Sequence, residues 1–420
     1  MPIAAAAPGD PPHLDDMTPA KPKLLFLTSR PPFPLHGGDA IRAFHLLQAL
    51  SNTFEIHLLA LTDGTPDGVL VHHALTAPIG PCATVELHKL SKLRSAFGGF
   101  SAWLRGEPIQ IGYYRSAALK RRVRDIAPRF DAVVSHLVRM AEYAECLQVP
   151  RLLEYTDALS MFYSKLLERK DVPMNLKALV YRFERPRILR CELALAESFD
   201  VLSFAGEDDR RWLADRSIAV KAKGITALNG VTSVPWYGPA KPDRSRLVFL
   251  GNMRTLQNQD AAFWFAEKVL PRVKKRLPGT RLQIVGHAPE AISRRLRTYD
   301  DVDVMGIVED IAPVLRTALA GLCPIRLGAG IQNKVLDYMN HGLPVVSSLL
   351  GVAGLGSIAV PGDTHLQAEE ADEWVEAILR LHSDNELRNR LANGGRALVE
   401  NSFSWQRNLA PVVETLKRHF

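Results

Sequence analysis

A lysine and an aspartate near position 335 have the residue types and the spacing to bind a nucleotide. In the segment IRLGAGIQNKVLDYMNHGLPVVSS, Lys334 and Asp337 are three residues apart, close to one helical turn, so both would share a helix face. The preceding glycines place Lys334 in the first turn, where free N–H groups and the positive end of the helix dipole favour a phosphate. A diphosphate and a ribose would suit such a face. The alternative is an exposed ion pair on a helix surface.

Other candidate residues follow apolar segments that we interpret as strands. Arg326 stands between a strand and the glycines, either as a second cation for a leaving phosphate or as a loop arginine paired with a carboxylate. His136 ends the segment DAVVSH, where it could hydrogen-bond a ligand, although a lone histidine is more often structural. Asp157 follows RLLEYT, either as a ligand contact or as a helix cap.

The elements that position these residues alternate between strands and helices. Apolar runs such as KLLFLT, FEIHLLALT and RLVFLG are each followed by a polar turn and a helical pattern. This alternation predicts an α/β protein with parallel, doubly wound sheets, which bind ligands at the carboxyl ends of their strands. Gly37 and Gly38 precede the first helix, where they either let the backbone approach a ligand closely or simply form a turn, and Asp39 is expected as the N-cap, shortly before Arg42.

The length of 420 residues exceeds what one hydrophobic core usually supports, and the strand and helix pattern breaks once, at GVTSVPWYGPAKPDRSR. We therefore expect two Rossmann-like domains facing across a cleft. The expected boundaries are a disordered tail over 1–22, an N-terminal domain over 23–232, a linker over 233–243, a C-terminal domain over 244–402, and a helix over 403–420 that can pack back on the first domain.

Composition favours a globular enzyme, since 47% of residues are hydrophobic and 23% are charged. Four cysteines without C-x-x-C spacing signal neither a zinc site nor a disulfide framework, and no apolar run is long enough to span a membrane. A cytoplasmic location fits these features.

Positive charge is concentrated in residues 89–129, where ten lysines and arginines face two acids. This favours an anionic partner. Few aromatic residues are interleaved and no reader motif occurs, so we expect no nucleic acid partner. Within the segment, Leu93, Phe97, Phe100 and Leu104 recur at helical spacing. The stripe predicts either a helix lying on an anionic membrane surface or one packed on the domain core.

Several motifs resemble family 4 glycosyltransferases of the GT-B fold, in particular bacterial exopolysaccharide sugar transferases of the kind associated with exosortases. They are KLLFLTSRPPFPLHGGDAIR, LNGV, LVFLGNM, RLQIVGHAP, VMGIVEDI, GAGIQNKVLDYMNHGLPVV and FSWQ, and the resemblance covers residues 23–420. It implies a nucleotide-sugar donor bound by the C-terminal domain, a lipid-linked or saccharide acceptor bound by the N-terminal domain, retention at the anomeric carbon, no metal ion and no cofactor. The expected location is the cytoplasm, at the inner face of the plasma membrane.

The resemblance and the residue chemistry together give a set of expected site residues. Asp337 occupies the place of the second glutamate of the family's E-x7-E pattern, which binds the donor ribose, while the first falls on Ala329. Asn252 and Asn258 replace an arginine and a lysine of many relatives, and Arg254 comes two positions late. The expected catalytic residues are Lys334, Arg326 and His136; the donor-binding residues are Gly38, Gly251, Asn252, Arg254, Gly286, Val308, Ala329, Gly330, Lys334 and Asp337; the acceptor-binding residues are Asp39, Arg42 and Asp157.

Two other functions remain open on sequence alone. A non-hydrolysing sugar-nucleotide epimerase would also hold a diphosphate, but it would use no acceptor. A non-catalytic binding protein of the same fold is suggested by the departures at Ala329 and Asn252.

Overall fold

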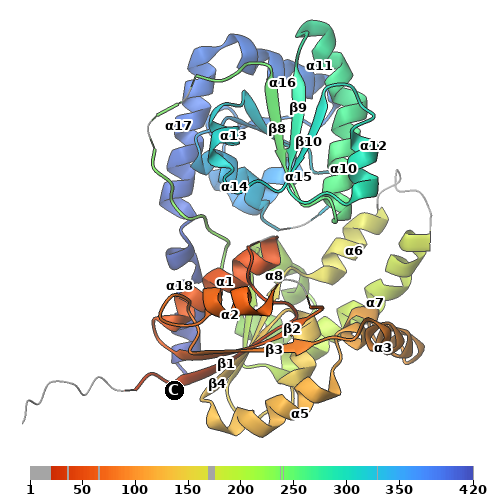
Figure 1. The fold of residues 1–420 in the computed structure, drawn as a ribbon, viewed down its shortest axis with the longest axis vertical. Coiled ribbons are helices and arrows are strands. Elements are labelled where there is room, and N and C mark those ends of the chain that lie inside the picture. The colour runs from red at the N-terminus through yellow and green to blue at the C-terminus, as the bar shows by residue number, and fades with distance from the viewer. Residues whose placement is uncertain are drawn as a thin grey trace, which may run out of the picture.

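The structure is a computed structural model that describes residues 20–35, 37–64, 67–168, 176–236, 238–239, 241–328 and 330–419. Two parallel β-sheets, each covered by helices, form an N-terminal and a C-terminal domain (Figure 1). Most of the expected tail and the candidate site residue Ala329 lie outside the described residues.

The N-terminal sheet has seven strands in the order β3-β2-β1-β4-β5-β6-β7, and all neighbouring pairs are parallel. Its central strands read as continuous apolar runs because helices cover both faces. The strands are β1 (Lys23–Thr28), β2 (Glu55–Thr62), β3 (Thr84–Lys89), β4 (Ala132–His136), β5 (Arg151–Thr156), β6 (Val201–Phe204) and β7 (Gly224–Thr226).

The helices of this domain connect the strands and cover the sheet. They are α1 (Gly38–Ser51), α2 (Gly68–Leu75), α3 (Lys92–Leu104), α4 (Ile109–Tyr113), α5 (Ala117–Ile126), α6 (Leu159–Glu168), α7 (Leu176–Ser198), α8 (Glu207–Ala214) and α9 (Ile218–Lys223), with 3-10 turns η1 (Ala127–Arg129) and η2 (Val138–Tyr143).

The C-terminal sheet repeats this plan with six strands in the order β10-β9-β8-β11-β12-β13. Its strands are β8 (Arg246–Leu250), β9 (Arg281–Val285), β10 (Val302–Gly306), β11 (Ala320–Cys323), β12 (Val345–Ser347) and β13 (Leu366–Gln367). Its helices are α10 (Leu256–Trp264), α11 (Leu270–Arg276), α12 (Glu290–Leu296), α13 (Ala312–Arg316), α14 (Asn333–Asn340), α15 (Leu349–Val352), α16 (Ala371–Ser383) and α17 (Asn385–Ser402); η3 (Phe265–Val269) is a π-helical turn and η4 (Ala353–Ile358) a 3-10 turn.

In both sheets the chain starts at an inner strand, runs to one edge, and returns to the other side of the first strand. The reversal falls between β1 and β4 in one domain and between β8 and β11 in the other. Doubly wound sheets bind ligands outside the carboxyl ends of the strands at such a reversal. The loops that follow these four strands are therefore the place to look for the site.

The last helix, α18 (Trp405–Lys417), returns from the C-terminal domain to the N-terminal one (Figure 1). Trp405 stacks on His45 of α1 with ring centroids 4.4 Å apart, and Leu409 and Leu416 are buried in the same hydrophobic cluster as residues of β1. The Val231 N–H donates to the Phe403 carbonyl at 2.8 Å. The chain thus crosses between the domains at two adjacent places.

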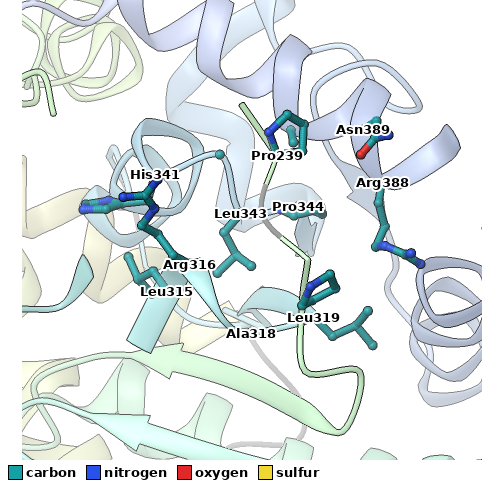
Figure 2. Close-up of a pocket in the computed structure, with 13 residues that line it drawn as sticks. Pro239, Leu315, Arg316, Ala318, Leu319, His341, Leu343, Pro344, Arg388 and Asn389 are labelled. Carbon is teal, nitrogen blue, oxygen red and sulfur yellow. The ribbon is translucent and has the colours of Figure 1, made fainter. Parts of the chain in front are cut away.

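The segment that leads into β8 lies along the C-terminal domain. Arg396 of α17 donates to the Val234 carbonyl at 2.8 Å, and Trp236 packs so closely on Gly342 that a Cβ there would come within 1.9 Å of its ring. Farther along, Pro239 and Leu343 help to line a cavity of about 20 Å³ (Figure 2), room for about one water molecule. This cavity is too small for a nucleotide.

Candidate active site

Lys334 lies in the first turn of α14, as the sequence predicts, and its side chain is buried. Its Nζ donates to Oδ1 of Asn258 at 2.8 Å and lies 3.4 Å from Oε1 of Gln332. Burial lowers the pKa of Lys334. Both hydrogen-bond partners are neutral amides, so the ammonium group is held in place without a directly bonded carboxylate.

Asp337 follows one turn later on α14 and is half-buried. Burial raises its pKa to about 7, and the positive charge of Lys334 opposes this shift only in part. The exposed ion pair considered from the sequence is not the arrangement found, because Lys334 is buried and donates to Asn258 instead. The two side chains remain separate contact points for a ligand.

Arg326, after β11, already has a carboxylate partner. Its Nη2 and Nε bond the two carboxylate oxygens of Asp260 at 2.8 and 3.1 Å, and its guanidinium lies 5.2 Å from the ring centroid of Trp264. The loop arginine paired with a carboxylate is therefore the arrangement found. A phosphate contact by Arg326 has no support from these partners.

The loop after β8 orients the partner of Lys334. Asn258 Nδ2 donates to the Asn252 carbonyl at 3.0 Å, which turns Asn258 Oδ1 toward Lys334. The Asn252 side chain accepts from the Arg254 N–H at 3.0 Å and so stabilises the turn. Arg254 itself is exposed. Asn252 thus supports the lysine through Asn258, while a donor contact by Arg254 stays a prediction.

Two glycines let the loops after β8 and β9 touch. Gly286 has φ of 129°, and a Cβ there would come within 2.4 Å of the Gly251 carbonyl oxygen. Only glycine fits this approach.

Val308, after β10, is half-buried, and its predicted backbone contact with a nucleobase stays a prediction.

The start of α14 meets the N-terminal domain. Asn333 Oδ1 accepts from Asn229 Nδ2 at 2.9 Å, and a Cβ on Gly38 would lie 3.6 Å from Asn333 Nδ2. Helix α1 therefore begins next to the helix that carries Lys334 and Asp337. Asp39 is the second residue of α1 and not its N-cap, which is Gly37, so that prediction is wrong. Its carboxylate is 3.3 Å from Arg30 in an ion pair.

The sequence predicted that Arg42 contacts an acceptor, and this prediction is wrong. Its guanidinium forms a bidentate ion pair with Glu154 at 2.9 and 3.0 Å, and both side chains are fully buried. It also donates to the Ala227 carbonyl at 2.8 Å and to Asn229 Oδ1 at 2.9 Å. Because no acceptor can reach it, Arg42 is a structural residue that holds Asn229 toward α14.

Two carboxyl groups of the N-terminal domain lie close to Gly330. A Cβ on Gly330, whose φ is 71°, would come within 2.9 Å of Asp157 Oδ1 and 3.7 Å of Asp209 Oδ2. Asp209 is buried and accepts from the Ala158 N–H at 2.7 Å, while its Oδ2 has no hydrogen-bond partner among the described residues. Burial raises the pKa of Asp209 to about 8, so this group can carry a proton near neutral pH. The side chain of Asp157 is exposed.

His136 ends β4 beside β1, at the reversal of the N-terminal sheet. It is buried, and its Nδ1 lies 3.3 Å from Thr28 Oγ1. Burial lowers the pKa of His136 to about 4, so the imidazole is neutral at pH 7. Its Nε2 has no hydrogen-bond partner in the described part of the chain. A contact between this atom and the transferred sugar stays a prediction.

Asn229, Asn333 and Asp209 are not among the site residues expected from the sequence. Asn229 lies in the quoted motif LNGV, and Asn333 directly precedes Lys334, but their hydrogen bond joins residues 104 positions apart. In the part of the chain that the structure describes, no group of three or more His, Cys, Asp and Glu side chains is placed to hold a metal ion.

Comparisons with known proteins agree with this geometry. Residues 244–384 match the family described as glycosyl transferases group 1. An uncharacterised 44.6 kDa protein in the cps region of Klebsiella pneumoniae is 24% identical over 353 residues, covering 80% of this chain and 85% of that protein.

Solved structures show the same architecture over almost the whole chain. HepE from Anabaena in complex with UDP has a TM-score of 0.63 at 14% identity, covering 94% of this chain and 100% of that one. Sucrose-phosphate synthase from Thermosynechococcus elongatus has a TM-score of 0.66 at 15% identity, covering 94% and 98%. WaaG, a glycosyltransferase involved in lipopolysaccharide biosynthesis, has a TM-score of 0.61 at 12% identity, covering 94% and 99%.

The protein has the GT-B fold, with two Rossmann-like domains, as the sequence predicts. It is a glycosyltransferase, and the match to the group 1 family lies in residues 244–384 of its C-terminal domain.

Proposed function

We propose that this enzyme transfers a sugar from a nucleotide-sugar donor to a lipid-linked or saccharide acceptor, with retention at the anomeric carbon and without a metal ion or cofactor. The product would be a bacterial exopolysaccharide or another cell-surface glycan, a context suggested by the cps-region relative. The observation that carries the proposal is Lys334, a buried ammonium group with neutral amide partners at the start of α14.

Lys334 is suited to the charge that develops during sugar transfer. As the glycosidic bond to the nucleotide breaks, negative charge grows on the diphosphate oxygens, and a fixed cation there lowers the barrier. Because Asn258 and Gln332 are neutral, a diphosphate can approach Lys334 without displacing a bonded carboxylate. The free N–H groups at the start of α14 add further donors. Arg326, paired with Asp260, would have the smaller role.

Asp337 would hold the donor ribose. An ionised carboxylate can accept hydrogen bonds from two ribose hydroxyls. Structures of HepE with UDP and with UDP and glucose show that a protein of this fold binds such a nucleotide. By analogy, the diphosphate would lie at Lys334 and the ribose one helical turn further along α14.

The acceptor would enter from the N-terminal domain. Asp157 lies against Gly330, and the neutral His136 ends β4 at the reversal of the sheet. The exposed Asp157 carboxylate can accept hydrogen bonds from sugar hydroxyls. We place the reaction in the cytoplasm at the inner face of the plasma membrane, with a peripheral membrane contact through residues 89–129. No helix among the described residues is long and apolar enough to cross a bilayer.

We expect Asp337→Asn to weaken binding of a nucleotide sugar and to remove most of its dependence on pH near neutrality. Because the pKa of Asp337 is raised to about 7, the carboxylate is lost as pH falls below that value. Wild-type affinity should therefore decrease toward pH 5.5, by at most about tenfold per pH unit.

Calorimetry with the matching nucleotide sugar is the measurement, since its doubly esterified diphosphate does not titrate in this range. Equal affinity of the wild-type and Asp337→Asn proteins from pH 5.5 to 8 would show that Asp337 does not contact the donor.

A donor screen tests the proposed reaction. We expect one of a panel of nucleotide sugars to release its nucleoside diphosphate when a lipid-linked or oligosaccharide acceptor is added, at an unchanged rate in excess EDTA. The stereochemistry of the product at the anomeric carbon, read by NMR, tests retention. Formation of an epimer from donor alone would indicate an epimerase instead. Donor binding without turnover on any acceptor would indicate a non-catalytic protein.

A further inference from the structure

Helix α3 is attached to its domain through its small residues. Its buried positions are Ser95, Gly99 and Ala102, which form one helical stripe. On the same side, a Cβ at Gly98 would come within 2.4 Å of the Gly112 carbonyl oxygen of α4. Gly98 and Gly99 therefore allow α3 and α4 to pack at close range, and their effect is not only to weaken the helix.

The opposite face of α3 exposes its large apolar side chains. The exposed fractions are 85% for Leu93, 73% for Phe97, 57% for Phe100 and 65% for Leu104. A surface helix of a globular domain normally turns such a stripe toward the core. The core-packing alternative considered from the sequence is therefore wrong. Phe100 stacks on Trp103 of the same helix with ring centroids 6.0 Å apart, and the stripe remains exposed in the described chain.

Helix α7 adds apolar residues next to α3 (Figure 1). Its Arg187 guanidinium lies 5.9 Å from the ring centroid of Trp103, and its Glu184 accepts from the Ile109 N–H at 2.8 Å, which fixes α7 against α3 and α4. Phe183, one turn before Arg187, is 54% exposed. We call Leu93, Phe97, Phe100, Leu104 and Phe183 the α3–α7 surface.

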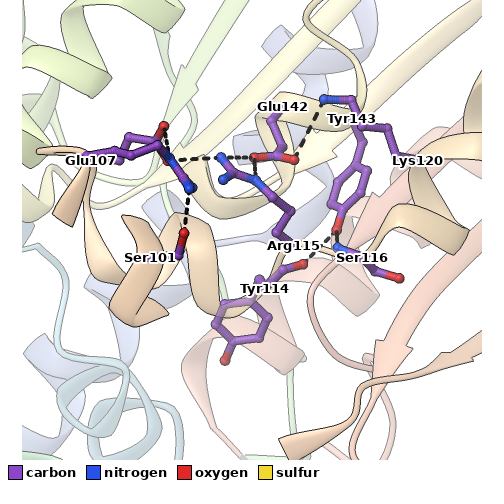
Figure 3. Close-up of polar contacts among 9 residues, drawn as sticks. Ser101, Glu107, Tyr114, Arg115, Ser116, Lys120, Glu142 and Tyr143 are labelled. Carbon is purple, nitrogen blue, oxygen red and sulfur yellow. Dashed lines mark hydrogen bonds and ion pairs between the residues drawn. The ribbon is translucent and has the colours of Figure 1, made fainter. Parts of the chain in front are cut away.

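Much of the positive charge in residues 89–129 is internally paired. Arg115 pairs with Glu107 at 3.1 Å and with Glu142 at 2.8 Å, and Lys120 lies 3.8 Å from Glu142 (Figure 3). These contacts tie α4 and α5 to the domain. The segment therefore offers a partner less charge than its composition suggests.

The bases beside the exposed stripe are different. Lys89, Lys92 and Arg94 are exposed and form no ion pair with a residue that the structure describes. They lie immediately before or within the first turn of α3. Uncompensated positive charge is thus placed at the end of an uncovered apolar face.

We propose that the α3–α7 surface docks on an anionic lipid bilayer, with the apolar side chains in the interface and Lys89, Lys92 and Arg94 against the headgroups. This inference rests on the proposed function, which gives residues 89–129 a peripheral membrane contact near a lipid-linked acceptor, and it assigns that contact to particular side chains. Apolar residues at helical spacing beside free bases suit an interfacial helix. The positive charge favours an anionic bilayer over a second copy of the chain, whose matching surface would carry the same bases.

Sedimentation of the full chain with vesicles tests this. We expect binding to vesicles of phosphatidylcholine with 30% phosphatidylglycerol, little binding to phosphatidylcholine alone, and release as salt is raised. Leu93→Ser with Phe97→Ser should reduce the partition coefficient at least tenfold. Lys92→Glu with Arg94→Glu should also weaken binding and abolish the preference for anionic lipid.

The matched control is Ile218→Ser on α9, which removes a side chain of similar exposure, 87%, from a different helix and should leave vesicle binding unchanged. Nucleoside diphosphate release with a water-soluble acceptor, measured without lipid, reports the transferase separately and should be unaffected in every variant. Binding that needs no anionic lipid, or that survives both double substitutions, overturns the proposal. So does a dimer that dissociates on Leu93→Ser with Phe97→Ser while vesicle binding is absent.

Discussion

Replacing Lys334 with alanine should lower kcat/KM for sugar transfer by roughly a hundredfold to a thousandfold, the loss expected when one preorganised donor to a developing oxyanion is removed. The effect should be large because Lys334 is held by Asn258 and has no bonded carboxylate to share its charge. Steady-state release of the nucleoside diphosphate is the measurement. Thermal unfolding of the same variant checks that α14 is intact.

Arg326→Ala is the matched comparison. Its guanidinium is already paired with Asp260, so its removal should cost less activity than loss of Lys334. If Lys334→Ala turned over at the wild-type rate, Lys334 would have no role in stabilising the leaving diphosphate. An Arg326→Ala loss equal to that of Lys334→Ala would show that the ion pair with Asp260 opens to reach the donor.

Replacing Arg42 with methionine should destabilise the N-terminal domain by about 3–5 kcal/mol, because it leaves Glu154 charged and buried without its partner. The free energy of unfolding, from chemical denaturation followed by a probe in that domain, is the measurement. Arg42→Met combined with Glu154→Leu should recover much of the loss, since no buried charge remains.

The same variants separate a structural role of Arg42 from the acceptor contact that the sequence suggested. The double variant should keep measurable transfer with an unchanged KM for the acceptor. If Arg42→Met instead raised the KM for the acceptor and left the free energy of unfolding unchanged, Arg42 would contact the acceptor and would not be a structural residue.

The features predicted correctly from the sequence are those that depend on local residue patterns and on strand topology. The apolar run at 24–28 marks β1, found at Lys23–Thr28, and the glycines before Lys334 place it in the first turn of α14. Both results follow from interactions within a few residues, and the carboxyl ends of parallel strands then collect His136, Gly251 and Arg326 at two sheet edges.

Partners that are far apart in sequence could not be predicted. In the sequence, Arg42 looks like an ordinary polar residue near the start of a helix. Its partners Glu154 and Asn229 are far away in sequence and come next to it only in the folded chain. Arg326 was correctly placed after a strand, but Asp260, which compensates its charge, comes from α10 of the same domain. Whether a cation is free for a ligand depends on such pairs, not on its own position.

Helix α3 shows a second limit. Periodicity at Leu93, Phe97, Phe100 and Leu104 indicates an apolar face but not the direction in which that face points. The small residues on the other side carried the missing information, because close packing of α3 on α4 turns the large ones outward. A stripe of small residues opposite a stripe of large ones is therefore worth seeking in sequences of this kind.

The return of α18 to the first domain affects how the chain can fold during synthesis. The apolar face formed by α1 and the N-terminal sheet is completed by Trp405, Leu409 and Leu416, which leave the ribosome only after the whole C-terminal domain. At typical elongation rates the wait is on the order of 10–30 seconds. During that time the early domain exposes an uncovered hydrophobic surface, which is open to aggregation and to chaperone binding.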